Sequence, residues 1–216
     1  MAHISDLTPE VRVELPDCPS VMINRYLVNT VRDFCWQTYY WQQEMTPISL
    51  LPMMEQVPDS YLYSLPVPTV TELITVRELL YEGEPLRMRS QDWLDNNLPG
   101  WRSLTGDPKY YLMMSDKLVR FVPGSDRVQP GAITGTLVLR PAKKASQFGD
   151  CLLDFDQALV CGCLSRMMLM ANRPWSNERR AATCAMAYAE GISQAKYRVL
   201  KGFSEGAETV ERRTWG

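Results

Sequence analysis

The clearest hydrophobic pattern of the chain follows Pro174-Trp175-Ser176-Asn177 and continues to about Leu200. Apolar positions recur there every three or four residues, which is the period of one helix face. Ser176 or Asn177 is a suitable N-cap, and Gly202 is a suitable stop. The face is made mostly of small residues, so we expect a closely packed partner. Its members are Ala181, Cys184 or Ala185, Tyr188, Ile192, Ala195 and Val199.

Two other segments have the same helical period. The first runs from Val21 to about Glu44, with one apolar face that comprises Ile23, Leu27, Val31, Phe34, Thr38 and Trp41. The second runs from about Gly149 to Ala171, with a face that comprises Leu152, Phe155, Leu159, Cys163, Met167 and Met170. No amphipathic helix buries its face alone, so we expect the three helices to pack on one another. We expect residues 1–19 to be a short lead-in with a mobile N-terminus.

The pattern changes between Pro47 and Pro141, where short apolar runs alternate with turn residues. Such runs predict strands, and here they span residues 48–51, 61–65, 70–80, 86–89, 110–114, 118–122 and 133–139. Glu82-Gly83, Pro123-Gly124 and Gln129-Pro130-Gly131 are predicted turns between them. A short helix over residues 90–98, capped by Ser90, interrupts the series. Strands of this length and spacing predict a small antiparallel sandwich or barrel.

The predicted fold class is therefore α+β. We expect an antiparallel helical bundle, built from the N-terminal helix plus two C-terminal helices, with an inserted small antiparallel β-sandwich or barrel. Residues 1–46 and 142–201 form the predicted bundle domain, and residues 47–141 form the inserted β-domain. Residues 202–216 have no hydrophobic period and are predicted to be an extended C-terminal arm.

Composition narrows the class of protein. The 216 residues are 45% hydrophobic and 22% charged, as in soluble globular proteins. The formal net charge of −2 lacks the basic excess typical of nucleic-acid-binding proteins. No apolar run approaches the ~20 residues that cross a bilayer, and the polar, acidic start of the chain does not have the pattern of a signal peptide. Six cysteines without a CxxC pair favour buried free thiols in a reducing compartment over disulfides.

Residues that could perform catalysis are scarce. His3 is the one histidine of the sequence, which argues against histidine-based triads and general-base schemes. Cys161 and Cys163 are two residues apart on a predicted helix and point in opposite directions, so they cannot share a metal. The same holds for Asp154 and Asp156, and no glycine-rich phosphate loop occurs. We therefore predict no catalytic, cofactor-binding or metal-binding residue, and a protein that is not an enzyme.

Three groups of residues, in this order and spacing, resemble the head-to-tail adaptor (connector) proteins of tailed bacteriophages, from roughly residue 12 to 200. The first is the opening helix, which ends in an aromatic residue. The second is a leucine-aspartate, a tryptophan and a glycine-x-proline before a strand that ends in proline. The third is a pair of C-terminal helices. The residues are Ile23, Leu27, Val31, Phe34-Cys35 and Trp41; Ser90, Leu94-Asp95, Trp101, Gly106-Asp107-Pro108-Lys109-Tyr110 and Pro123; and Gly162, Leu164, Met167, Met170, Pro174-Trp175-Ser176-Asn177, Ala181 or Ala182, Ile192 and Ala195. The chain departs from the family in having Cys163 and methionines where alanine and leucine are expected.

The resemblance implies a structural virion protein at the neck of the particle, made in the host cytoplasm. Such a subunit forms a homo-oligomeric ring of about twelve copies that docks beneath the portal protein after DNA packaging. The ring extends the DNA channel and provides the docking platform for tail or nozzle proteins. Double-stranded DNA passes through the lumen without sequence-specific binding, so the lack of a basic excess is no objection. The resemblance implies no cofactor and no membrane.

The resemblance also indicates surfaces for partners. The C-terminal arm of such adaptors reaches the portal or a neighbouring subunit, and the candidates here are Phe203, Arg212, Arg213 and Trp215. The polar face of the last helix, opposite its apolar face, is a candidate surface for neighbouring subunits. It carries Arg179, Arg180, Glu190, Gln194 and Lys196.

Other functions stay open at this point. Within the same virion, a tail-completion or tail-tube subunit is the alternative. From another class, the chain could be a small hydrolase, although no base is visible beyond dispersed carboxylates, or a cellular binding module. A ring with a central pore, formed together with a portal, would distinguish the adaptor from a monomeric enzyme or binding module.

Overall fold

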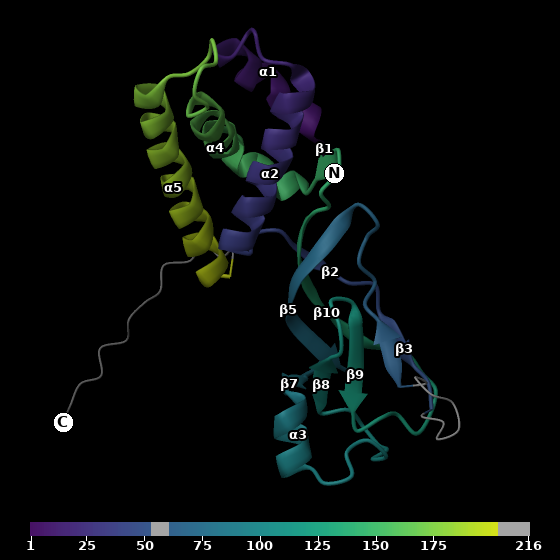
Figure 1. Cartoon of the computed structure of the whole chain (residues 1–216). Helices are drawn as coiled ribbons and strands as arrows, with labels where there is room; N and C mark the ends of the chain where they lie inside the picture. The colour runs from purple at the N-terminus through teal and green to yellow at the C-terminus, as the bar shows by residue number, and fades with distance from the viewer. Residues whose placement is uncertain (53–60, 203–216) are drawn as a thin grey trace, which may run out of the picture.

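The computed structural model of the chain describes residues 1–52 and 61–202. It is a mixed α+β structure, which confirms the predicted class. Most of the helices gather at one end and the larger sheets at the other, with α3 beside the sheets (Figure 1). The helices of the described ranges are α1 (Ile4–Glu14), α2 (Ser20–Thr38), α3 (Gln91–Asn97), α4 (Asp156–Met168) and α5 (Glu178–Leu200), with the 3-10 helix η1 (Asp150–Phe155) directly before α4.

Four of these helices pack on one another. Helix α5 lies along α4, α2 contacts both, and α1 contacts α2 and α4. The close approach depends on Gly162 of α4, where a Cβ atom would lie 2.6 Å from the ring of Tyr188 and 2.7 Å from the methyl of Thr30. Small residues thus allow α4 to approach α5 and α2 at van der Waals distance, where dispersion contacts are strongest.

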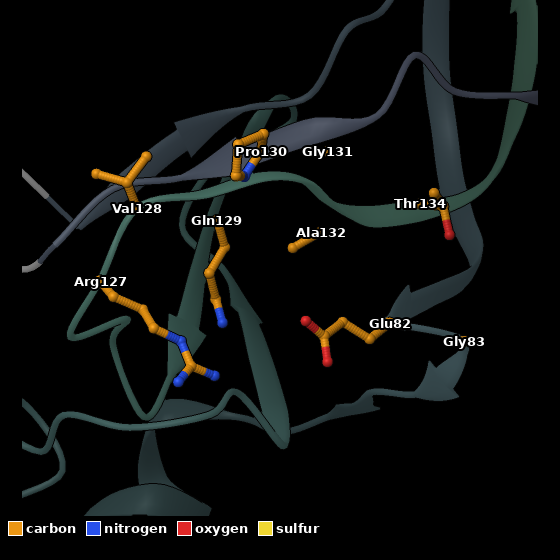
Figure 2. Close-up of a pocket in the computed structure, with 9 residues that line it drawn as sticks. All are labelled: Glu82, Gly83, Arg127, Val128, Gln129, Pro130, Gly131, Ala132 and Thr134. Atoms are coloured by element: carbon orange, nitrogen blue, oxygen red, sulfur yellow. The ribbon is translucent and has the colours of Figure 1, made fainter.

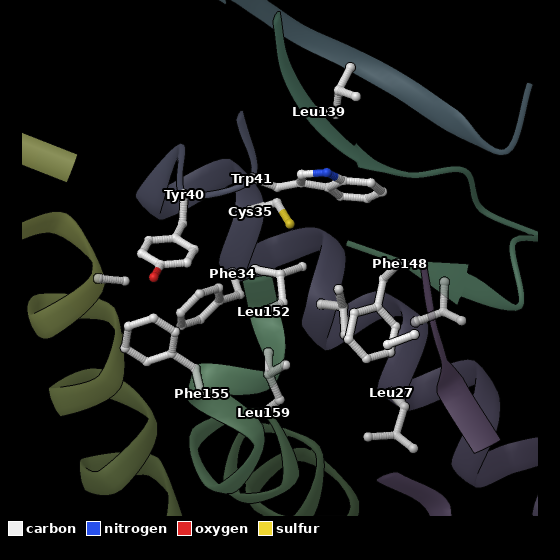
Figure 3. Packing of buried hydrophobic residues seen from close by; sticks show 14 of the residues in the cluster. Leu27, Phe34, Cys35, Tyr40, Trp41, Leu139, Phe148, Leu152, Phe155 and Leu159 are labelled. Carbon is white, nitrogen blue, oxygen red and sulfur yellow. The ribbon is translucent and has the colours of Figure 1, made fainter. Parts of the chain in front are cut away.

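The helical core is aromatic at the end that meets the sheets. Phe155 packs against Phe34 and Tyr40, with ring centroids 5.3 and 4.9 Å apart. Figure 3 shows Trp41 between this group and Leu139 of the sheet. Because all five side chains are buried in one continuous cluster, the helical and β parts share this hydrophobic core. A second, smaller cluster of Leu94, Trp101, Leu112 and Val122 lies beside α3.

An ion-pair group joins α2 to the sheet beside Trp41. Arg32 is 9% exposed and donates to the carbonyl of Pro141 and, at 2.9 Å, to Glu72. Arg140 reaches the same carboxylate at 3.0 Å. The two guanidinium groups hold the pKa of Glu72 below its ordinary value, the hydrogen bond from Arg32 being the largest cause. The carboxylate therefore connects α2 to two neighbouring strands.

The sheets are organised around one long strand, β10 (Gln129–Pro141). It lies between β5 (Thr71–Tyr81) on one side and β2 (Gln42–Glu44) and β3 (Ile48–Leu50) on the other, and β6 (Glu84–Pro85) extends the sheet beyond β5. A second sheet has the order β4 (Leu62–Ser64), β9 (Leu118–Val122), β8 (Tyr110–Met113) and β7 (Arg87–Met88). The short strands β1 (Ala2–His3) and β11 (Gln147–Phe148) form a third pair.

The antiparallel prediction is wrong for one pair. Strands β7 and β8 pair in parallel, with Arg87 opposite Tyr110, because the chain between them passes through α3 and returns to the same end. Parallel neighbours need such a crossover. The other strand pairs of the described residues are antiparallel. Whether the sheets form a sandwich or barrel stays a prediction.

The predicted turn at Gln129-Pro130-Gly131 is also wrong. These residues belong to β10, whose register with β3 shifts between Gln129 and Ile133. Gly131 adopts a φ of 61°, a left-handed conformation that glycine tolerates best. Pro130 has no N–H to contribute to the ladder, so the signals taken for a turn mark an irregularity within a strand.

The prediction for residues 1–19 is wrong as well. Helix α1 buries Ile4, Leu7 and Val11 on one face, a helical spacing that Pro9 in the middle of the segment concealed. The expected mobile N-terminus is likewise contradicted, because the main chain of His3 pairs with Gln147 in the β1–β11 ladder.

The remaining helix predictions differ mainly at their ends. Helix α2 ends at Thr38 instead of Glu44, because Tyr39 takes a φ of 54° and the chain then turns so that Tyr40 and Trp41 enter the core. The segment predicted over 149–171 begins as η1 and ends at Met168. The extents of α3 and α5 are confirmed, with Ser90 and Asn177 as their N-caps.

Candidate functional site

A hollow of about 440 Å³ lies where β5 turns into β6 and β10 begins. The turn consists of Glu82 and Gly83, both with positive φ, and the N–H of Glu82 donates to the carbonyl of Ala132 at 3.0 Å. Figure 2 shows the side chains of Arg127, Gln129 and Glu82 directed into this space from two sides. The hollow is therefore lined by charged and amide groups on strand ends.

A polar network connects this hollow to the neighbouring loop. The hydroxyl of Tyr81 donates to the carboxylate of Asp107 at 2.7 Å and lies 2.7 Å from the amide of Gln129. Arg127 reaches the same carboxylate at 3.2 Å. Burial raises the pKa of Tyr81, and the hydrogen bond to Asp107 adds to the effect. The phenol thus stays protonated, and these groups satisfy one another as a structural network.

The lining of the hollow provides several groups that can form hydrogen bonds. It offers a carboxylate, a guanidinium, an amide and the hydroxyl of Thr134, which could hold a polar peptide segment. Among the described residues, those that line the hollow include no histidine or cysteine.

The residues considered as catalytic candidates have structural partners. Asp154 accepts from Arg198 at 3.0 Å and from the hydroxyl of Tyr40 at 3.2 Å, which connects η1 to α5 and to the segment that follows α2. The six cysteines are free thiols, and burial raises the pKa of Cys161 to about 11, far above that of a reactive thiolate. Within residues 1–52 and 61–202, no group of three or more His, Cys, Asp or Glu side chains is placed to hold a metal ion.

The leucine-aspartate and tryptophan of the sequence resemblance meet in the structure. Leu94 and Trp101 are buried, and Asp95 accepts hydrogen bonds from the indole N–H of Trp101 at 2.8 Å and from Arg102 at 2.7 Å. Their role is to fix α3 against the following loop. Asp95 is six residues from Trp101 and seven from Arg102. The sequence spacing therefore indicated a local unit but did not show these hydrogen bonds.

Sequence reasoning missed two arginine–aromatic stacks beside α3. Arg120 is 5% exposed, and its guanidinium lies 3.8 Å from the ring centre of Tyr61 and 4.6 Å from that of Trp101. Arg89 lies 4.5 Å from the ring centre of Trp93. Arginines that stack on aromatic rings are common at protein interfaces, and the sequence signal was the enrichment of tryptophan and arginine around α3.

The predicted contact residues of the arm, Phe203, Arg212, Arg213 and Trp215, lie outside the described residues. By contrast, the polar face predicted on α5 is exposed, although Arg180 uses its charge within the chain, in an ion pair with Glu14 of α1 at 2.7 Å. None of the helices in the described ranges is both long and apolar enough to span a membrane.

Comparison with known proteins decides the family. None of the curated proteins compared with the chain matches it. The family described as SU10 adaptor protein matches residues 3–212. Because this match spans nearly the whole chain, the protein belongs to the SU10 adaptor family and is a structural adaptor of the bacteriophage neck.

Proposed function

We propose that this protein is a head-to-tail adaptor that forms a ring of about twelve copies beneath the portal. The ring extends the DNA channel and provides the docking platform for tail or nozzle proteins. The observation that carries the proposal is the family match over residues 3–212.

The two ends of the molecule suit different tasks in this assembly. The helical part, residues 1–46 and 142–201, would form the wall of the ring, since its long helices present extended faces. The inserted part, residues 47–141, would face other neck or tail proteins, because it carries the polar hollow and the stack of Arg89 on Trp93. Residues 202–216 would be an arm.

Double-stranded DNA would pass through the lumen without sequence-specific contacts. A net charge of −2 fits this task, because strong attraction to phosphates would slow the movement of DNA. The subunit would be made in the host cytoplasm and assembled into the virion neck after packaging.

Imaging of the protein with its portal tests the proposal. Mixed at equal subunit ratio, the two proteins should form a ring with a central pore in negative-stain images, and native mass spectrometry gives the number of copies. Because adaptors of this kind assemble on the portal, the portal must be present. A chain that stays a monomer and never binds the portal would contradict the function.

Removal of residues 203–216 tests the arm. We expect the deletion to weaken portal docking by at least about tenfold, because aromatic and arginine residues dominate interface energies. Phe203, Arg212, Arg213 and Trp215 are then replaced singly by alanine, and binding is measured by surface plasmon resonance. Lys117→Ala, at the far end of the molecule, is the matched control. Unchanged affinity after the deletion would refute a role for the arm.

A further inference from the structure

Helix α5 has a second apolar face, opposite the one that packs on α4. Along this outward line Met186, Tyr197 and Leu200 are 67%, 58% and 85% exposed. The full line, which we call the outer stripe, is Ala182, Met186, Ala189, Ser193, Tyr197 and Leu200. Each member is exposed and follows the previous one by three or four residues, so they lie on one side of the helix.

This composition is unusual for a helix face in water. Surface helices place charged residues opposite their buried face, and a helix that is apolar on both sides is normally covered on both. The outer stripe contains no Asp, Glu, Lys or Arg from Ala182 to Leu200, whereas α5 carries its charges on the flanks. The outer stripe therefore requires a partner surface, and the other side of the helical part offers one.

Helices α1 and α2 provide a matching surface there. Figure 1 shows α5 on one side of α4 and α1 on the other. A groove of about 380 Å³ between α1 and α2 is lined by Ser5, Thr8, Pro9, Arg12, Val13 and Asn24, and Val13 is 82% exposed. Alanine is small and methionine is flexible, so both suit a groove with this mixture of apolar and short polar groups.

The two surfaces also carry opposite charge. Residues 4–19, which hold α1 and the following turn, have four acidic side chains and one basic side chain. Residues 178–201, which hold α5 and its last turn, have five basic and two acidic side chains. Arg180 and Arg198 already pair with Glu14 and Asp154 of the same chain. The other charges of the two segments would therefore add a modest attraction between α5 and α1 of different copies.

We propose that the outer stripe of α5 packs into the α1–α2 groove of the next copy of this chain. Two different surfaces on opposite sides of one subunit form a head-to-tail contact, and such contacts form a ring when the rotation between neighbours closes. The inference rests on the proposed ring and deepens it by naming the two surfaces that meet. One repeated contact, α5 on α1 and α2, then forms the wall.

The size of the stripe sets the strength of this contact. From Ala182 to Leu200 the helix rises about 27 Å, and with a width of ~10 Å the stripe covers roughly 270 Å². A stable interface buries about 800 Å² on each partner. The contact is thus weak for a pair of free subunits, so assembly requires concentrated protein or a portal that holds many copies in place.

A charge placed on the stripe tests the proposal. Met186→Lys should weaken self-association of concentrated protein at least about tenfold, measured by sedimentation velocity over a concentration series. The variant should unfold at the same temperature as the wild type, because the side chain is largely exposed. Asn96→Lys, an exposed position on α3 away from the helical part, is the matched control and should associate normally. Equal association of Met186→Lys and wild type would overturn the proposal.

Cross-linking of mixed variants tests the pairing. In a Cys151→Ser background, Ala189→Cys and Val13→Cys proteins are mixed at high concentration and treated with a short bismaleimide. We expect dimers that contain one copy of each variant, and none beyond background from either variant alone. Dimers of Ala189→Cys with itself would indicate a two-fold contact, and no mixed dimer would exclude the α1–α2 groove. Either result would overturn the proposal.

Two controls identify what covers the outer stripe and distinguish that contact from portal binding. The mixed cross-link should form equally well with the full chain and when residues 203–216 are deleted. A mixed cross-link that forms only after the deletion would identify that segment, instead of a second copy, as the group that covers the stripe in the full chain. Portal binding is measured with the same variants. A single subunit of Met186→Lys should still bind the portal while ring closure fails, whereas loss of binding by the wild type itself would instead refute the proposed function.

Discussion

At the scale of single residues, Gly162 marks the point where α2, α4 and α5 come closest. A methyl group there would overlap the ring of Tyr188 and the methyl of Thr30, two side chains that are themselves buried. The surroundings are packed on every side, so a substitution has no free space to fill and must displace its neighbours.

Gly162→Ala should therefore lower the free energy of unfolding by about 1–3 kcal/mol, the usual cost of overpacking. Urea denaturation followed by circular dichroism measures the change. Asn29→Ala on the exposed side of α2 is the control and should be neutral or slightly stabilising, because alanine favours the helix. A Gly162→Ala protein as stable as the wild type would mean that the helices can separate at no cost.

Glu72 gives the molecule a defined response to acid. Its pKa is lowered below the ordinary value of 4.5, chiefly by the hydrogen bond from Arg32. The folded-state pKa lies below that of the unfolded chain, so the stabilisation is fully present above about pH 4.5 and is lost as the pH falls through the folded-state value.

Glu72→Gln should accordingly cost about 1–2 kcal/mol at neutral pH, a modest figure because a third of the carboxylate side chain remains in water. The difference from the wild type should shrink below pH 4.5. Urea unfolding at several pH values measures it, with Glu78→Gln on the exposed side of the same strand as control. A difference that stays constant with pH would assign the effect to packing.

At the scale of elements, the start of α5 depends on one side chain. The carbonyl oxygen of the Asn177 side chain accepts from the N–H of Arg180 at 3.0 Å. Asn177→Ala should cost about 1 kcal/mol and lower the melting temperature by about 2–4 °C. Asn177→Asp, which keeps an acceptor, should retain most of the stability. If both variants lose the same amount of stability, the hydrogen bond of the cap is not the cause of the loss.

The elements also show where sequence reasoning succeeds. Positions 181, 184, 188, 192 and 195 are buried as the period of α5 predicts, because a long regular face has one way to meet a core. Boundaries followed tertiary contacts instead: α2 ends where Tyr40 and Trp41 turn inward. Strand β2 and the crossover that makes β7 and β8 parallel depend on distant partners, which a local pattern does not contain.

The candidate surfaces were less predictable than the fold. The polar residues of α5 were visible as a face, yet the outer stripe was not, because alanine and serine also occur on buried faces. The α1–α2 groove lay in a segment where Pro9 concealed a helix. The hollow of Figure 2 requires residues 82 and 127–134 to meet across two strands, and their separation in sequence gave no signal.

At the scale of the whole molecule, the continuous core predicts joint unfolding. Residues of α2, η1 and β10 belong to one buried cluster, and Arg32 and Glu72 bridge the same junction. The helix signal in circular dichroism and tryptophan fluorescence, which reports on Trp41 in the helical part and Trp101 near α3, should change in one transition. Two separate transitions would show instead that residues 47–141 fold as an independent domain.

The chain leaves and re-enters the helical part at nearly the same place. Residues 42–44 pair with 136–138 of β10, and the N–H of Leu139 donates to the carbonyl of Trp41 at 2.9 Å. The residues between these two points are therefore attached to the helical part at one junction, where the entering and leaving segments lie side by side. Their removal would leave two ends that a short linker can join. In the proposed ring, changes within this section would leave the exposed faces of α5 and α1 in place, so contacts with tail proteins could vary while the proposed contact between subunits is kept.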